Sequence, residues 1–315
     1  MIIDCDAGVD DSMAILMALS AHKKEEVEVL AITATAGNAA LENVEINILR
    51  TLDIAGCGDI PVFRGASEAL VVPCDDDGCH DRFNGLDGFN DVKFDSDPDR
   101  GRISDELAWN AMSRLSKEYP GEVTIVGMGP LTNIATAIKA DPGLSERLRE
   151  IFIMGGNMDG VGNVKGAAEF NFHTDPEAAY IVLRLAQCPL YVLPWEVCLR
   201  SKLEMTWRRD VMGHITSSSI QFLNRLEEWM LTSDNDWYIL ADQLVMLAAI
   251  DRHTVTKITE EVAMVELKGD LTRGMMVLDR REGKGVENMR KNAIIIQEID
   301  MEMLKKQLIN LLKEL

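Results

Sequence analysis

MIIDCDAGVDDSMAILMALSAH, residues 1–22, places four aspartates between a short apolar strand and an apolar helix. We predict the strand over residues 1–3 and the helix over residues 12–22, because apolar side chains dominate both segments. The aspartates between them are Asp4, Asp6, Asp10 and Asp11. A strand that leads directly into a helix through a polar turn is typical of α/β proteins.

The acidic turn has two interpretations. Capping and the helix dipole favour one or two acidic residues at a helix N-terminus, which would make the turn a solvated surface feature. Four carboxylates this close repel one another unless some are protonated or a cation is bound. Their oxygens suit a hard cation such as Ca²⁺ or Mg²⁺, and Gly8 fits the tight turn that a metal loop needs. We therefore favour a metal site.

Further along the chain, short apolar runs alternate with longer amphipathic ones. The predicted strands cover residues 27–33, 122–126, 150–154 and 190–193. The predicted helices cover residues 41–55, 131–139 and 176–186. This alternation predicts the α/β class, with an open, mostly parallel central sheet flanked by helices.

The C-terminal part adds a helical and small-strand region. The pattern is helical over residues 201–251, and predicted strands at 262–267, 274–278 and 293–297 precede a last helix at 301–315. Residues 64–102 are rich in Gly, Asp and Pro, and a loop of this length usually covers a site or is disordered. Without a repeat or a linker, residues 1–315 are predicted to form a single domain.

Composition excludes several classes of function. The 315 residues include 32 Lys and Arg against 52 Asp and Glu, a net charge of −20, which argues against nucleic acid or an anionic membrane as partner. No apolar run reaches the roughly 18 residues of a membrane span, and no secretory signal is present. Six scattered cysteines without a CxxC pair favour reduced thiols and a cytoplasmic location.

Small and polar residues follow each predicted strand. They are Gly37-Asn38, the segment 127–133, Gly155-Gly156-Asn157 with Asn163 and residues 169–171 beyond, and Pro194-Trp195-Glu196. Ligands of open parallel sheets bind beyond the carboxyl ends of the strands, so these residues should converge there. Neutral polar groups of this kind suit a polyhydroxylated ligand, although a single Asn is more often a turn residue.

A nucleotide-binding loop and a phosphohydrolase site are the alternatives to a metal site. GxxxxGK[ST] and strand-following GxGxxG motifs are both absent. Asp4 and Asp6, two residues apart at a strand end, are similar to the nucleophile pair of haloacid-dehalogenase-type phosphohydrolases. In such an enzyme, Asp10 and Asp11 would repel the phosphate, so this alternative is the weaker one.

The motifs together resemble a known family, the calcium-dependent nucleoside hydrolases of the inosine-uridine preferring group. DCDAGVDD at residues 4–11 is similar to the family signature DxDxGxDD. The resemblance continues in order through Gly37-Asn38, GPLTN at 129–133, MGG at 154–156, AEFN at 168–171, DPEAA at 175–179 and the helical Asp242. It spans nearly the whole chain and implies the nucleoside hydrolase fold.

The resemblance implies a cofactor and a ligand set. Ca²⁺ would be bound by Asp6, Asp11, Asp242 and the backbone carbonyl of Met128, and a water held by the ion would attack the N-ribosidic bond. Asp6 would be the general base, and Asp10 would hydrogen-bond a ribose hydroxyl and share in catalysis. Further implied roles are Asn38 and Asn171 at the 2′/3′ diol, Asn163 and Glu169 at the 5′-hydroxyl, and Asp4 as an acceptor behind the ligands.

The sequence departs from the family where the base would bind. Many members carry a His directly before the helical metal-binding Asp and another in a loop motif like HGxxG. Ala241 and Asn84 stand at these two positions here. Candidate contacts of the base are His80, Asn84, Phe83, Trp195, Trp237 and Tyr238. Trp237 and Tyr238 would lie about one helical turn before Asp242, which would bring at least one ring near the site.

We therefore expect hydrolysis of ribonucleosides to ribose and a free purine or pyrimidine base. The alternative is a catalytically impaired relative that binds ribose or nucleosides but lacks the acid for the leaving group. The family forms homodimers or homotetramers, so one of these is expected. Relatives usually carry a few more residues before the first strand, so we expect a shortened N-terminus.

Overall fold

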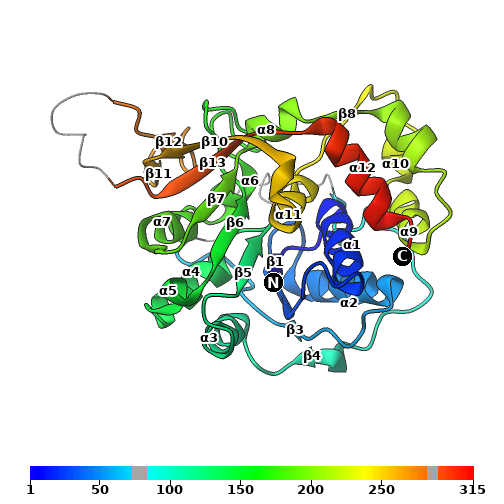
Figure 1. Cartoon of the computed structure of the whole chain (residues 1–315), viewed down its shortest axis with the longest axis horizontal. Helices are drawn as coiled ribbons and strands as arrows, with labels where there is room; N and C mark the ends of the chain where they lie inside the picture. Colours follow the sequence, from blue (N-terminus) through cyan, green and yellow to red (C-terminus); the bar gives the residue numbers. More distant parts are fainter. Residues whose placement is uncertain (73–83, 282–289) are drawn as a thin grey trace.

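A nine-stranded sheet runs through the computed structural model, which describes residues 1–72, 84–281 and 290–315 (Figure 1). Its strand order is β10-β13-β7-β6-β5-β1-β2-β3-β4, and all neighbours are parallel except β10 and β13. The strands are β1 (Ile2–Cys5), β2 (Ala31–Ala34), β3 (Val62–Phe63), β4 (Ile103–Ser104), β5 (Thr124–Gly127), β6 (Glu150–Met154), β7 (Leu190–Leu193), β10 (Val255–Glu261) and β13 (Ala293–Ile299). The predicted open, mostly parallel sheet is confirmed.

Helices cover both faces of this sheet (Figure 1). On one face lie α1 (Val9–Lys23), α2 (Leu41–Ala55), α11 (Asp242–Ile250) and α12 (Met301–Leu312). On the other lie α3 (Ala108–Glu118), α4 (Thr132–Ala140), α5 (Leu144–Arg147) and α7 (Pro176–Leu185). Helix α1 packs against α2, α11 and α12, which explains why it is buried on nearly all sides.

Shorter elements connect these layers. They are a 3₁₀ turn at Arg100–Arg102, α6 (Phe170–Thr174), α8 (Trp195–Arg200), β8 (Leu203–Glu204), a π-helical turn at Trp207–Met212, α9 (Ser218–Leu226), α10 (Glu228–Leu231), β9 (Trp237–Tyr238), a 3₁₀ turn at Arg252–Thr254, β11 (Ala263–Val265) and β12 (Met276–Leu278). Strands β8 and β9 form one small antiparallel pair, and β11 and β12 form another.

Three predicted elements have the observed bounds, namely α2, β6 and β7. The strand expected at 27–33 begins at Ala31, because β1 begins at Ile2 and the parallel register pairs Ile2 with Ala31. The helical interpretation of residues 201–251 is wrong at β8 and β9, because these two segments pair with each other as antiparallel strands. Helix α3 and strands β3, β4 and β10 were not predicted.

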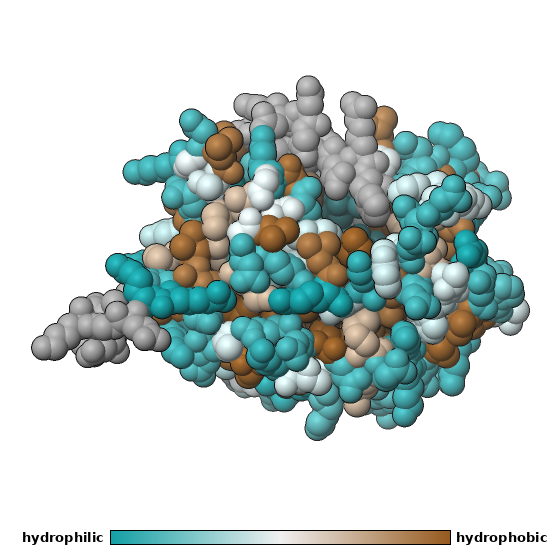
Figure 2. Space-filling view, turned by 90° about the horizontal axis from the view of Figure 1, so that it is seen from above, coloured by the Kyte–Doolittle hydropathy of each residue, from teal (hydrophilic) through white to brown (hydrophobic). Residues whose placement is uncertain are grey.

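The surface is mainly hydrophilic, as the charge of −20 implies (Figure 2). On the face shown there, apolar residues form patches between hydrophilic ones. Within the described ranges, every helix is too short or too polar to cross a lipid bilayer.

Candidate functional site

The loops that follow β1, β2, β5, β6 and β7 meet at the carboxyl edge of the sheet and enclose a cavity of about 320 Å³. This edge includes the point between β1 and β5 where the strand order reverses, the usual place for a ligand in such folds. The cavity is lined by Asp10, Asn38, Asn84, Met128, Met154, Asn163, Glu169, Phe170, Asn171, Trp195, Ile239, Ala241 and Asp242. Its size is sufficient for a small ligand.

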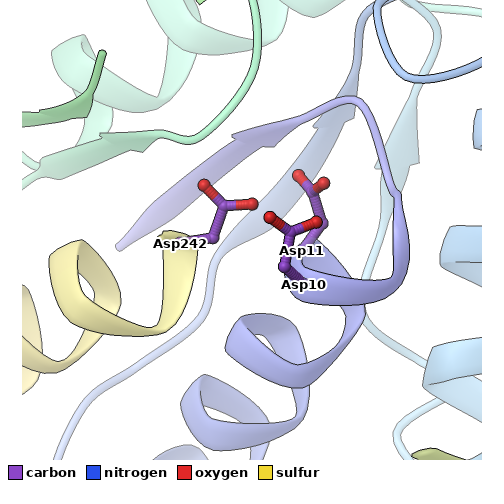
Figure 3. Close-up of side chains that lie close together, drawn as sticks. All are labelled: Asp10, Asp11 and Asp242. Carbon is purple, nitrogen blue, oxygen red and sulfur yellow. The ribbon is translucent and has the colours of Figure 1, made fainter. Parts of the chain in front are cut away.

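Three aspartates converge at one end of the cavity (Figure 3). Asp10 and Asp11 stand in the first turn of α1, and Asp242 is the first residue of α11, which packs against α1. One carboxylate oxygen from each lies within 4.8 Å of the others. Burial and then the negative charges of the neighbouring acids raise the pKa of Asp242 well above its ordinary value. The cluster therefore favours a bound cation or a proton.

Asp6 and Asp11 each keep one oxygen without a hydrogen-bond partner. Asp6 Oδ2 accepts from the backbone N–H of Asn38 at 2.7 Å. Asp11 Oδ2 accepts from the N–H of Gly8 at 2.9 Å and from Asn38 Nδ2 at 3.1 Å. The other two atoms, Asp6 Oδ1 and Asp11 Oδ1, are buried and have no partner. Burial and the negative charge of Asp10 raise the pKa of Asp11 to about 7, although the hydrogen bond from Gly8 opposes the shift.

The backbone around these acids is tightly constrained. The positive φ of 37° falls on Ala7, whereas Gly8 is extended, so the expectation that Gly8 makes the turn is wrong. A Cβ on Gly8 would instead lie 2.6 Å from Asn38 Nδ2, so the position requires glycine for space. Likewise, a Cβ on Gly37 would lie 2.1 Å from Asp6 Oδ2. A left-handed alanine is uncommon, and such strain often marks a functional site.

The carbonyl of Met128 and the side chain of Asn171 lie together on the cavity wall. Asn171 Nδ2 donates to Met128 O at 2.7 Å and to Met154 O at 3.1 Å. Met128 is almost fully buried and is one of the residues that line the cavity. A carbonyl oxygen has two lone pairs, so this contact is compatible with a further ligand.

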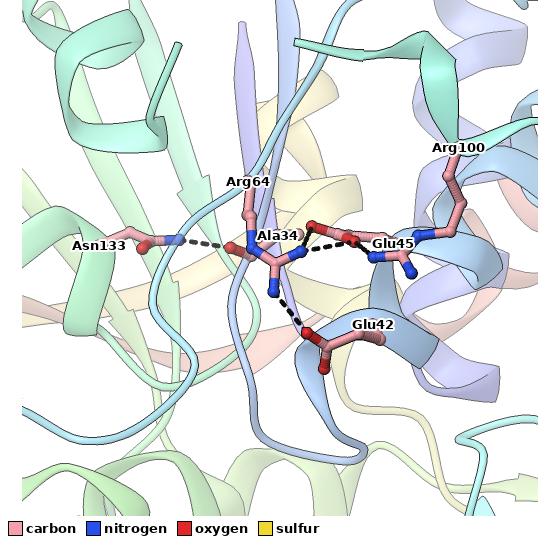
Figure 4. Close-up of polar contacts among 6 residues, drawn as sticks. All are labelled: Ala34, Glu42, Glu45, Arg64, Arg100 and Asn133. Atoms are coloured by element: carbon pink, nitrogen blue, oxygen red, sulfur yellow. Dashed lines mark hydrogen bonds and ion pairs between the residues drawn. The ribbon is translucent and has the colours of Figure 1, made fainter. Parts of the chain in front are cut away.

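Asp4 does not line the cavity and lies in the layer behind it. Its Oδ1 accepts from Thr33 Oγ1 at 2.6 Å and from Asn133 Nδ2 at 2.8 Å. Asn133 also donates to the carbonyl of Ala34 at 2.9 Å (Figure 4) and accepts from the N–H of Ala66. Burial raises the pKa of Asp4 to about 7. Asn133, which was not predicted as a site residue, thus ties the ends of β1 and β2 together.

Polar side chains line the remainder of the cavity. Asn84 donates to Asn38 Oδ1 at 3.1 Å and accepts from the N–H of Val9 at 3.3 Å. Glu169 begins α6 and accepts from three backbone N–H groups, those of Gly156, Asn171 and Phe172, at 2.8, 2.8 and 3.2 Å. Burial raises its pKa to about 7 although these bonds oppose the shift. The structure thus brings Asn38, Asn84, Asn163, Glu169 and Asn171 to one cavity, as the sequence predicts.

Among the aromatic candidates, only Trp195 lines the cavity within the described residues. Trp237 is 48% exposed and lies over the Lys202 ammonium at 4.2 Å. Tyr238 is 2% exposed and donates to Glu227 Oε1 at 2.6 Å. The expectation that helical spacing brings one of these rings to the site is wrong, because both residues belong to β9. His80 and Phe83 lie outside the described residues.

Three apolar lining residues were not assigned a role, although Phe170 belongs to the segment 169–171 that was expected at this edge. Met154 ends β6 and Phe170 stands between Glu169 and Asn171, so the strand-end rule that found their neighbours also covers them. Ile239 follows β9, and the helical interpretation of that segment concealed it. Together with Trp195 and Ala241, they form an apolar part of the lining, called the apolar wall below.

The donor atoms at the acidic end fit a hard cation. They are carboxylate and carbonyl oxygens, and no Cys or His of the described chain lines the cavity. Calcium takes oxygen ligands of this kind, whereas zinc and copper favour nitrogen and sulfur. The unpartnered oxygens of Asp6 and Asp11 are the clearest sign of a cation site, since buried polar atoms nearly always have a hydrogen-bond partner.

Comparisons with known proteins agree with this geometry. The family profile described as inosine-uridine preferring nucleoside hydrolase matches residues 1–306. Uridine nucleosidase 1 of Arabidopsis thaliana is 33% identical over 274 residues, 85% of this chain and 79% of the relative. The pyrimidine-specific ribonucleoside hydrolase RihA of Salmonella paratyphi C is 32% identical over 309 residues, 96% and 94% of the two chains. The solved structure of an inosine-guanosine nucleoside hydrolase superimposes with a TM-score of 0.89 at 29% identity, covering 99% of this chain and 98% of the other.

Proposed function

Because the chain belongs to the inosine-uridine preferring nucleoside hydrolase family, and is therefore a ribonucleoside N-ribohydrolase, we propose that it uses Ca²⁺ and the residues described above to cleave the N-ribosidic bond. The observation that supports the ion is the pair of buried, unpartnered oxygens Asp6 Oδ1 and Asp11 Oδ1. Asp242 and the carbonyl of Met128 would complete the protein's share of the ligands. When bound, Ca²⁺ supplies positive charge that orients sugar hydroxyls and lowers the pKa of a neighbouring water.

Asp6 is the general base of this proposal. Its Oδ2 accepts from the N–H of Asn38, which fixes the carboxylate in place beside the ion to take a proton from the attacking water. Cleavage of an N-ribosidic bond develops positive charge at C1′, as in glycoside hydrolysis. The surrounding carboxylates, Asp10 and Asp242 among them, stabilise that charge. A positioned general base contributes about 10²–10⁴-fold to the rate.

The remaining polar residues bind the sugar. Asn38 and Asn171 lie beside the acidic end and hold the 2′- and 3′-hydroxyls together with Asp10. Asn163 and Glu169 hold the 5′-hydroxyl, and Asp4 supports the acids from behind through Thr33 and Asn133. Asn163 Oδ1 accepts from the N–H of Phe170 at 2.8 Å, which leaves its Nδ2 group to donate to a ligand.

The base lies against the apolar wall in this proposal. Trp195 offers a face for stacking, and Ile239 and Ala241 leave space beside it. In this proposal the departing base takes its proton from water, because Ala241 and Asn84 stand where many members of the family carry His. The names of the relatives, a uridine nucleosidase and a pyrimidine-specific ribonucleoside hydrolase, make uridine the first substrate to test.

The test is release of ribose from uridine, inosine and cytidine by the purified protein, measured as reducing sugar in millimolar Ca²⁺ and again in EDTA. We expect turnover with calcium and its loss with the chelator. Tight ribose binding without turnover on any nucleoside would instead support the alternative, a relative that binds nucleosides but does not cleave them. Turnover that is unaffected by EDTA would exclude the calcium site.

A second prediction concerns the 2′-hydroxyl. If the residues around the acidic cluster grip the diol, 2′-deoxyuridine loses these contacts, and kcat/KM should fall about 100-fold relative to uridine. The measurement compares both substrates at several concentrations under identical calcium. Equal rates on the two nucleosides would contradict the assigned roles of Asn38 and Asn171.

Assembly and location complete the proposal. We assign the chain to a homodimer or homotetramer, which sedimentation velocity can distinguish. Cys5, Cys57, Cys188 and Cys198 are free thiols, which is compatible with a reducing, cytoplasmic location.

A further inference from the structure

Glu196 stands beside the cavity but has no role in the mechanism described above. It is the second residue of α8, directly after Trp195, and only 5% of it is exposed. Its carboxylate accepts from the backbone N–H groups of Met158, Asp159 and Val161 at 2.8, 2.8 and 3.1 Å. All three donors belong to the loop that follows β6, and none belongs to its own helix.

The loop that Glu196 binds has little regular structure. Residues 156–169 contain no helix or named strand before α6 begins, and their own backbone bonds are long, such as Gly162 N to Gly166 O at 3.3 Å. Side chains therefore hold this loop. Asn157 donates to the carbonyl of Ala167 at 2.7 Å, Glu169 accepts from Gly156 N–H, and Glu196 binds the stretch between them. Of the residues that these anchors hold, Val161, which donates to Glu196, is the nearest in sequence to Asn163 on its N-terminal side.

Trp195 and Glu196 join two walls of the cavity. The N–H of Trp195 donates to the carbonyl of Gly156 at 3.0 Å, and its ring lines the cavity. The next residue, Glu196, fixes residues 158–161, and the chain then reaches Asn163 at the cavity rim. A shift of α8 or of this loop would therefore change the distance between the stacking face and the Asn163 amide.

We propose that Glu196 is a positioning residue that clamps the loop at 158–161, so that the Asn163 amide is held ready for the 5′-hydroxyl of the nucleoside. The inference rests on the proposed function, because the assignment of Asn163 to that hydroxyl comes from there. A buried carboxylate satisfied by three peptide N–H groups is a strong and directional clamp, since hydrogen bonds to a charged acceptor are worth more than neutral ones. The clamp favours substrates with a free 5′-hydroxyl.

The test compares Glu196→Gln with native protein on uridine and on 5′-deoxyuridine. The amide keeps the shape of the side chain but turns one acceptor into a donor that faces a backbone N–H. We expect kcat/KM on uridine to fall about 10-fold, mainly through KM, and to change little on 5′-deoxyuridine. In Asn163→Ala protein, the same substitution should add no further loss on uridine, because the positioned group is already gone.

Asp300→Asn is the matched control. Asp300 also accepts from two backbone N–H groups, those of Glu302 and Met303 at the start of α12, and does not line the cavity. It should lower thermal stability without raising KM for uridine. The positioning role would be overturned if Glu196→Gln lowered kcat/KM equally on both substrates. It would also be overturned if the fall in kcat/KM were fully explained by a smaller fraction of folded protein.

Hydrogen exchange separates this inference from the proposed function. The amides of Met158, Asp159 and Val161 should exchange faster in Glu196→Gln than in native protein, whereas those of α12 should not change. This readout needs no turnover, so it decides the clamp even if uridine proves not to be a substrate. Native-like protection of the three amides in the variant would overturn the proposal whatever the activity.

Discussion

Two groups of buried carboxylates in this chain solve the same physical problem differently. Glu45 on α2 has a fully buried side chain and receives the guanidinium groups of Arg64, at 3.0 and 3.1 Å, and of Arg100 (Figure 4). Asp242, at the cavity, is surrounded by negative charge, because the groups that raise its pKa beyond the effect of burial are all acids (Figure 3). Glu45 is neutralised by arginines of the chain, whereas Asp6 Oδ1 and Asp11 Oδ1 have no hydrogen-bond partner among the described residues.

The difference indicates what each group is for. A buried charge is costly unless it is paired, and the chain supplies arginine where pairing serves the fold. At the cavity, Asp6 and Asp11 receive hydrogen bonds from backbone N–H groups and an amide, and Asp6 Oδ1 and Asp11 Oδ1 have no partner among the described residues. Glu169 and Glu196 form an intermediate class, because each is satisfied by three peptide N–H groups. The two buried oxygens of Asp6 and Asp11 that have no hydrogen-bond partner thus indicate a place for an external cation.

The largest effect should come from Asp6→Asn. The change removes the proposed general base and one ligand of the cation, so kcat on uridine should fall about 10²–10⁴-fold. Glu45→Gln is the matched control, because it converts another buried carboxylate to an amide outside the cavity. Its kcat should stay within about twofold of native.

Initial rates of ribose release at saturating uridine and calcium give kcat for Asp6→Asn and for Glu45→Gln. Circular dichroism of each variant confirms that the compared proteins are folded. A Glu45→Gln protein as inactive as Asp6→Asn would remove the functional distinction between the two groups. Full activity in Asp6→Asn would exclude the proposed base.

Calcium should stabilise the protein by relieving repulsion at the cavity. At a free concentration 100 times its Kd, a ligand that binds only the folded state adds about 2.7 kcal/mol to the free energy of unfolding. For a chain of this size, that corresponds to a rise of about 5 °C in Tm. Scanning calorimetry of EDTA-treated protein, with and without added Ca²⁺, measures the shift.

Asp242→Asn and Asp53→Asn sharpen this test. Asp242 belongs to the cavity cluster, so its substitution should abolish most of the shift in Tm. Asp53 pairs with Arg102 at 2.6 Å on the surface, so its substitution should leave the shift intact. An equal calcium shift in both variants would show that the ion binds elsewhere.

The same contrast explains how much the sequence could predict. The acidic cluster was found because Asp6, Asp10 and Asp11 are close in sequence and stand between a strand and a helix. Glu45 and its arginines were missed, because Arg64 and Arg100 are 19 and 55 residues away and approach it only after β3 and the long connection have folded. In a local motif, closeness in sequence already places the residues close in space. The sequence gives no such signal for an ion pair between distant segments that have no hydrophobic period.

The fold class was predicted correctly, but some short elements were missed for a similar reason. Elements with a strong period, such as α2, were found at their observed bounds. Strands β3 and β4 have only two residues each, and their extent depends on pairing with a neighbour rather than on their own pattern. Trp237 and Tyr238 were assigned to a helix, although pairing with Leu203 and Glu204 makes them a strand. Sequence pattern therefore predicts the parallel sheet better than the small antiparallel pairs.

The carboxyl group of Glu169 should make the free energy of unfolding depend on pH. A Gln at this position does not titrate and should remove that contribution. Burial raises the pKa of Glu169 from 4.5 to about 7, so the folded protein keeps this proton after the unfolded chain has released it. The stability that the group contributes is therefore complete below pH 4.5 and is lost as the pH rises toward 7. Over that interval, the free energy of unfolding should fall by about 1 kcal/mol per pH unit more in native protein than in Glu169→Gln.

Urea unfolding of the calcium-free proteins between pH 5 and pH 7.5 measures this difference in slope. Glu302→Gln, an exposed change at the start of α12, is the control and should retain the native slope. Parallel curves for native and Glu169→Gln would show that the carboxyl group titrates alike in the folded and unfolded states. The peptide N–H groups would then stabilise its charge as well as water does.

The smallest effect should be the loss of stability in Glu45→Gln. Arg64 and Arg100 are 38% and 44% exposed at their side chains, so water can solvate both guanidinium groups once the carboxylate is gone. The amide still accepts one hydrogen bond, and the expected cost is about 1 kcal/mol rather than that of a fully buried pair. The midpoint of urea unfolding should fall without a change in m-value, and by the same amount with and without Ca²⁺. A cost that appeared only in the presence of calcium would mean that Glu45 is coupled to the cavity, and the two groups of acids would then form one system.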